Sequence, residues 1–180
     1  MIDDLAVLVA NYLSGTTDPT VSVNALIPTV SLRANDQMPP LIKAVYDDVR
    51  TARIIEGEEP DATPALVVTV STDIVIRLLG GQPVAPADTV PNAPVVVAVS
   101  YVAPLGDLPK ARADAGYTMK AVRRCLGALG TRATAEQKTL NATRLIQIRR
   151  VVERRLFASK GASALLGIVL AQCTVRDLAP

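Results

Sequence analysis

Four arginines near the C-terminal end form the sharpest cluster of charge in the chain: Arg149, Arg150, Arg154 and Arg155. Guanidinium groups pair with phosphates, so one interpretation is that this cluster contacts a nucleic-acid backbone without reading its sequence. The alternative is a solvent-facing strand or a salt-bridged contact between subunits. We favour the alternative because the aromatic side chains on which single-stranded bases stack are scarce, with one Phe and no Trp.

No other group of residues has the types and spacing that catalysis requires. The chain contains no histidine, which removes the commonest general base and excludes Ser-His-Asp and Cys-His catalysis. Gly80 and Gly81 lack the lysine and the helix of a phosphate-binding loop. Four acidic residues fall in one short stretch, Glu56, Glu58, Glu59 and Asp61. We interpret them as a solvated turn, and we expect no catalytic residues, no metal, no cofactor and no enzymatic activity.

The two cysteines, Cys125 and Cys173, stand far apart in the sequence. They match no metal-binding pattern and no disulfide framework. We expect both to be small buried residues that carry free thiols in a reducing compartment.

Charge is distributed unevenly, although the net charge is only +2. Residues 1–108 carry a net charge of −8 and residues 109–180 a net charge of +10. Three explanations are open: the basic part contacts nucleic acid, or subunits meet acidic edge to basic edge in a ring. The third explanation is that both parts of the chain interleave in one sheet, so that the charge asymmetry vanishes in the folded protein.

The central elements that must position these groups are a strand over residues 95–102 and a helix over residues 107–130. The strand is rich in β-branched residues, and both of its faces are apolar, which predicts an interior strand covered on both sides. Asp107 is the expected N-cap of the helix and Pro109 lies in its first turn. The apolar stripe of the helix consists of Ala111, Ala115, Met119, Val122, Leu126 and Leu129. Lys110, Asp114, Tyr117, Lys120 and Arg124 are expected on its other side.

Two glycines interrupt this helix, Gly116 and Gly127. Each weakens the helix by roughly 1 kcal/mol relative to alanine. Their lack of a side chain leads us to expect that the helix lies close to the sheet there.

The remaining elements are assigned from periodicity and turn residues. We predict a helix over residues 2–13, and strands over 65–71, 74–79 and 164–175, with a tight turn at 72–73. Residues 41–55 are interpreted as extended rather than as a short helix, and residues 140–157 as a long strand rather than as a helix with the arginines on its polar face. Residues 21–30 are ambiguous because Pro28 interrupts them. Loops or turns are expected at residues 14–20, 35–40, 56–64, 80–93, 131–138 and 158–163.

This order of elements predicts an α+β fold in which a mainly antiparallel sheet carries an N-terminal helix and one long packed helix. The 180 residues are expected to form a single domain, residues 1–180. We identify no secretory signal and no apolar run long enough to span a bilayer, so we expect no membrane contact.

The order of these elements and several of their sequence segments resemble the tail terminator (tail completion) proteins of long-tailed phages, the lambda-type minor tail protein family. The resemblance covers most of the chain. It includes the first helix, the segments PLIKAVYD (residues 40–47), AVRRCL (121–126) and CTVRDL (173–178), and the strands between them.

The resemblance implies a structural virion protein that forms a homohexameric ring at the head-proximal end of the tail tube. Its partners would be identical copies, the tail tube protein and the head–tail connector or stopper, with DNA passing the lumen non-specifically. It would be located in the virion neck after assembly in the host cytoplasm. The alternatives are another neck protein, such as a head–tail adaptor or stopper, and a small nucleic-acid-binding protein that uses the arginine-rich C-terminal half.

Overall fold

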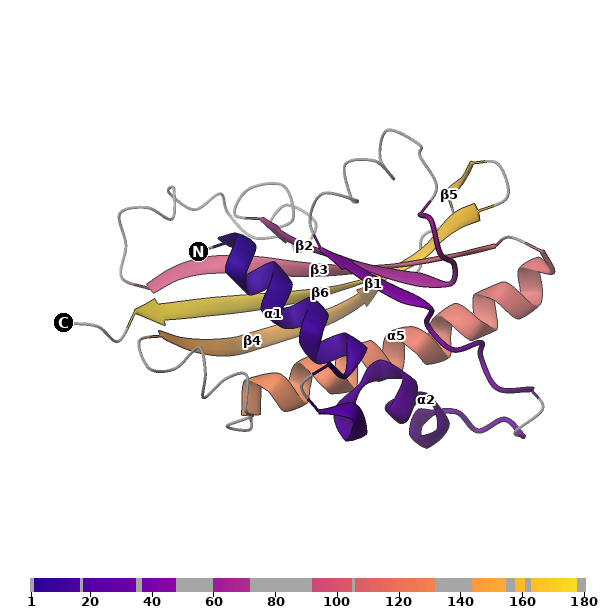
Figure 1. Cartoon of the computed structure of the whole chain (residues 1–180), viewed down its shortest axis with the longest axis horizontal. Helices are drawn as coiled ribbons and strands as arrows, with labels where there is room; N and C mark the ends of the chain where they lie inside the picture. The colour runs from indigo at the N-terminus through magenta and orange to yellow at the C-terminus, as the bar shows by residue number, and fades with distance from the viewer. Residues whose placement is uncertain are drawn as a thin grey trace.

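A computed structural model shows one mixed, mainly antiparallel β-sheet with helices packed on it (Figure 1), which confirms the predicted α+β fold. The structure describes residues 2–16, 18–34, 37–47, 60–71, 92–104, 106–131, 144–154, 158–160 and 163–177. None of the helices in these ranges combines the length and apolar character needed to cross a bilayer.

The strands lie side by side in the order β1-β2-β3-β6-β4, and the short β5 pairs with β6. Their bounds are β1 Ala44–Asp47, β2 Ala65–Ser71, β3 Asn92–Pro104, β4 Arg144–Arg154, β5 Ala158–Lys160 and β6 Ser163–Asp177. β1 runs parallel to β2, and every other described pair is antiparallel. The first 108 residues therefore supply one side of the sheet and the last 72 supply the other, which contradicts the idea that the two charged parts interleave.

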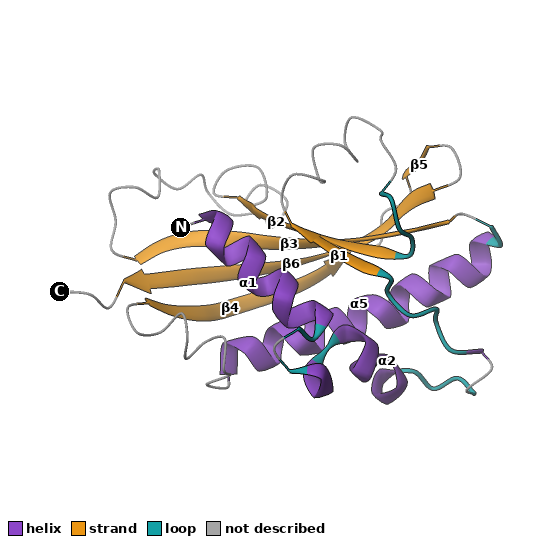
Figure 2. Cartoon of the chain, in the orientation of Figure 1, coloured by secondary structure: helices purple, strands orange, loops and turns teal. Residues whose placement is uncertain are grey.

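The helices α1, α2 and α5 lie together on one side of the sheet (Figure 2). Their bounds are α1 Ile2–Ser14, α2 Val23–Val30 and α5 Leu108–Thr131, with a short 3₁₀ helix, η1, at Pro19–Val21. α1 packs against β1 and β2, whereas α5 packs against β3, β6 and β4 and holds α2 on its outer flank. The predicted first helix is confirmed by α1.

The ambiguous residues 21–30 form η1 and α2, although Pro28 lies inside α2. The Ser22 side chain caps the helix by accepting from the Ala25 amide, 3.2 Å away. This cap stabilises the helix, whereas Pro28 lacks the N–H that would donate within it. The Asn24 side chain then binds both backbone groups of Ile42, at 3.0 and 2.8 Å. This bridge fixes the chain as it approaches β1, and periodicity alone does not reveal it.

The prediction for the central strand is confirmed: β3 lies between β2 and β6, and its side chains are buried on both faces. Val95, Val97, Val99 and Tyr101 join the main core beneath the helices. Val96 and Ala98 form a second cluster with Ile168 and Leu170 on the opposite face. The strand begins at Asn92, so the loop expected up to residue 93 ends earlier.

Two irregularities in register change which side chains of the C-terminal strands reach the main core. Leu166 has no partner between the pairs Tyr101–Gly167 and Val102–Leu165, and it joins the main core with Val169 instead of sharing a face with Ile168. A second shift falls between Ile148 and Arg150, and beyond it Val151 packs against the main core. A bulge adds one residue to one strand and so reverses the alternation beyond it.

α5 begins as predicted, because Asp107 accepts from the Lys110 and Ala111 amides through its side chain and its carbonyl. The expected apolar stripe is buried from Ala115 to Leu129, with Ala111 half-buried. Asp114 was expected on the polar side, and this is wrong: the residue is 5% exposed and forms an ion pair with Arg33.

Other expectations meet the structure only in part. Extended structure within residues 41–55 is confirmed for β1, the strand at 65–71 is confirmed by β2, and the long strand within 140–157 is confirmed by β4. The final strand is confirmed by β6, whereas the turn expected at 158–163 contains the short strand β5. The strand expected at 74–79, its turn at 72–73 and the acidic residues 56–59 lie outside the described residues.

Gly127 does not mediate close packing, which corrects our expectation for this glycine. A Cβ built there meets nothing within 4 Å. We expect Gly127→Ala to raise the free energy of unfolding by about 1 kcal/mol, because alanine restricts the unfolded chain and favours the helix.

Gly15 is the matched control for that substitution. Its φ is +80°, and an added Cβ would lie 2.6 Å from the Cβ of Ser22. We expect Gly15→Ala to lower stability by about 1–2 kcal/mol. Urea unfolding of both variants measures the two effects, and equal signs would contradict this account.

Candidate functional site

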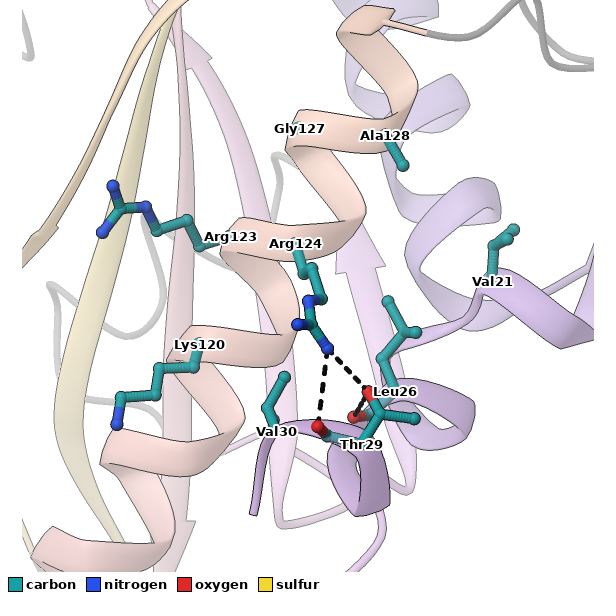
Figure 3. A pocket seen from close by; sticks show the side chains of 9 residues that line it. All are labelled: Val21, Leu26, Thr29, Val30, Lys120, Arg123, Arg124, Gly127 and Ala128. Atoms are coloured by element: carbon teal, nitrogen blue, oxygen red, sulfur yellow. Dashed lines mark hydrogen bonds between the residues drawn. The ribbon is translucent and has the colours of Figure 1, made fainter. Parts of the chain in front are cut away.

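An open groove lies between α2 and α5, on the side of α5 that does not face the sheet (Figure 3). Its volume is about 870 Å³. The lining residues are Val21, Leu26, Thr29, Val30, Lys120, Arg123, Arg124, Gly127 and Ala128. We call this feature the α2–α5 groove.

The groove combines an apolar floor with a cationic rim. Val21, Leu26, Val30 and Ala128 are half-buried, while the three cations Lys120, Arg123 and Arg124 are exposed. None of the lining residues that the structure describes is acidic. Such a surface favours a ligand that carries both apolar groups and negative charge, because each property alone would leave part of the groove unmatched.

Arg124 joins the two walls of the groove. Its guanidinium donates to the Thr29 hydroxyl at 3.0 Å and to the Thr29 carbonyl at 3.5 Å, and Figure 3 shows it reaching across to α2. Lys120 and Arg123 extend from the other flank of α5 in the same view. Arg124 therefore helps to hold α2 in place, whereas the Arg123 side chain extends away from α2 and is exposed.

A second network of side chains links Arg33 to the N-terminal half of α5. Asp114 pairs with Arg33, and the Lys110 ammonium lies 3.7 Å from the other carboxylate oxygen. The Arg33 guanidinium also lies 5.0 Å from the centre of the Tyr117 ring, and the Lys120 ammonium lies 5.4 Å from it. These contacts tie the segment after α2 to α5, next to the groove.

The arginines singled out from the sequence are only partly placed. Arg149, Arg150 and Arg154 belong to β4, where Arg150 pairs with Gln172 and Arg154 with Ile168. Their side chains, and the whole of Arg155, lie outside the described residues. The structure therefore shows that three of the four arginines share one strand, β4.

Sequence reasoning missed the α2–α5 groove. The available signal was the spacing of Lys120, Arg123 and Arg124, which places three cations on one face of a helix. The apolar wall of the groove comes from residues 21–30. Because the sequence leaves these residues ambiguous, it does not predict this wall.

The cysteine thiols lie in the core and are poor candidates for chemistry. Burial raises the pKa of Cys125 and that of Cys173 to about 12, so neither supplies a thiolate near neutral pH. In the described part of the chain, no group of three His, Cys, Asp or Glu side chains is placed to hold a metal ion.

The raised thiol pKa values predict that stability falls in alkaline solution. Between the ordinary pKa of 9.0 and the native value of about 12, the native thiol keeps a proton that the unfolded thiol has lost. The stabilisation is therefore complete below pH 9 and is lost as the pH rises. We expect the free energy of unfolding to fall by about 1 kcal/mol per thiol between pH 9 and pH 10. In urea titrations, a Cys125→Ala/Cys173→Ala variant should fall less steeply than the wild type, and parallel curves would contradict the assignment.

Comparison with protein-family models, with curated proteins and with solved structures finds no match to this chain. The resemblance to tail terminators accordingly stays a prediction from the sequence.

Proposed function

We propose that this protein is a structural subunit that assembles with identical copies into a ring, and that the ring is the tail terminator of a long-tailed phage. The observation that carries the proposal is the order of strands in the sheet. Among the described strands, one edge is formed by β1, from the acidic part of the chain, and the opposite edge by β4, from the basic part.

The two edges suit a contact between copies. β4 is an eleven-residue strand with four arginines and one glutamate, and β6 is its one neighbour among the described strands. β1 pairs with β2 alone in the same set and ends at Asp47, which is exposed. A long strand edge offers unpaired backbone groups to another chain, and unlike edges give a head-to-tail contact that can close into a ring.

Such a ring would stop growth of the tail tube and present a surface to the head–tail connector or stopper. This role needs geometry and no chemistry, which agrees with core cysteines and with a chain free of histidine. Arginines from the basic part of the chain would meet passing DNA through its phosphates, without sequence readout.

A second candidate is a small nucleic-acid-binding protein. The observation that favours it is the exposed trio Lys120, Arg123 and Arg124, none of which belongs to the arginine cluster of β4. Three cations on one face of a helix can contact a phosphate backbone.

The experiment is a mass measurement of the purified full chain, by native mass spectrometry and sedimentation, at low and high salt. We expect a hexamer that dissociates as salt screens the charged edges, and rings in negative-stain images. A chain that stays monomeric at every concentration, while its DNA affinity falls steeply with salt, would replace the ring with the second candidate.

A further inference from the structure

We propose that the α2–α5 groove receives residues 54–59 of a neighbouring copy. This inference rests on the proposed ring, for which it names the contact. The groove is an open surface with an apolar floor and three exposed cations, and its described lining contains no acidic side chain. A partner that fits it must bring apolar groups and carboxylates close together.

The chain itself contains such a segment. Residues 54–59 read Ile-Ile-Glu-Gly-Glu-Glu, so two aliphatic side chains are followed at once by three carboxylates. This is part of the densest acidic stretch of the sequence, which Asp61 continues. The segment lies outside the described residues, and its fit to the groove is argued from its sequence.

The lengths also agree. From Lys120 to Ala128 the groove runs along α5 for about 12 Å at the rise of an α-helix. Four extended residues span about the same distance, so Glu56 to Glu59 can pass the three cations while Ile54 and Ile55 reach the floor formed by Leu26 and Val30.

A neighbouring copy is the occupant that fits the ring. The segment is joined to β1 and β2, and α1 packs against those strands, while the groove belongs to α2 and α5. The segment and the groove are different parts of the chain, so copies can join head-to-tail, and such a contact can close into a ring. Opposite charges on the two parts also speed encounter and penalise wrong pairings.

The first test is cross-linking between two populations of the full chain. One population carries Gly127→Cys, where a side chain has open space, and the other, with a size tag, carries Gly57→Cys. We expect mild oxidation to give a disulfide heterodimer of tagged and untagged chains. The buried native cysteines serve as background, measured in a mixture of tagged and untagged wild type.

The second test uses charge reversal. We expect Arg123→Glu to weaken self-association about tenfold and Glu58→Arg to restore it in the double variant. Arg112→Glu is the control, because Arg112 is an exposed cation of α5 that lies outside the groove and away from both sheet edges, and it should leave the affinity between copies unchanged.

The outcomes separate this contact from the ring itself. A hexamer with neither the cross-link nor the charge rescue would overturn the groove contact and leave the proposed function standing. A disulfide formed within one monomeric chain that carries both cysteines would mean that the segment occupies its own groove. Absence of any self-association would overturn both proposals, and protection of the groove cysteine by DNA alone would assign the groove to nucleic acid.

Discussion

Replacing Arg33 with methionine is expected to lower the free energy of unfolding by about 3 kcal/mol, because it leaves a buried carboxylate without its main partner. The Asp114 side chain is 7% exposed and the Arg33 side chain 18% exposed. The Lys110 ammonium, on a side chain that is 61% exposed, replaces little of the lost interaction from 3.7 Å away. The loss corresponds to a fall in Tm of about 6–12 °C for a chain of this length.

The cost of that substitution is expected to come from the stranded charge rather than from lost packing. Asp114→Asn keeps the shape of the side chain and removes the charge, so Arg33→Met/Asp114→Asn should be more stable than Arg33→Met alone. Chemical unfolding of the wild type, both single variants and the double variant gives the coupling between the two residues. Additive losses would show that the ion pair is not the cause.

Tyr101 gives an independent check: burial, with a contribution from the Asp114 charge, raises its pKa to about 12, so Asp114→Asn should lower the pKa of this tyrosine.

The sequence predicts the middle of this molecule best. In β3 the run of β-branched residues leaves little freedom of interpretation, and both of its faces are buried as expected. In α5 the cap at Asp107 and the apolar stripe fix the beginning of the helix and its rotation. Both elements carry their signal within one continuous stretch, so no distant residue is needed to interpret them.

Features that depend on distant residues are the ones that the sequence does not reveal. Asp114 is polar and falls at a position that periodicity assigns to solvent, but Arg33, 81 residues earlier, makes its burial possible. The bulge at Leu166 is defined only by its pairing with β3, and a single extra residue changes which side chains reach the core.

The α2–α5 groove follows the same pattern. Its cations can be read from the helical spacing of α5, but its floor comes from a short helix that contains Pro28 and is held by the Ser22 cap and by the Asn24 bridge to Ile42. Proline inside a helix is normally a strong reason to end it. A site built from one predictable and one unpredictable wall therefore cannot be proposed before the structure is known.

Replacing Leu170 with alanine should cost about 3 kcal/mol, which is in the range of buried leucines that leave a cavity. Leu170 is fully buried at 0% exposure, yet it belongs to the cluster with Val96, Ala98 and Ile168, on the sheet face opposite to the helices. If that face forms a second core, as the two apolar faces of β3 predict, the loss should match that of Leu126→Ala in the main core. Leu32→Ala is the matched control, because Leu32 is 96% exposed and should change stability by less than about 0.5 kcal/mol. Urea unfolding at neutral pH compares the three variants. A small effect for Leu170→Ala beside a large one for Leu126→Ala would mean that the face opposite the helices contributes little to the stability of the isolated chain.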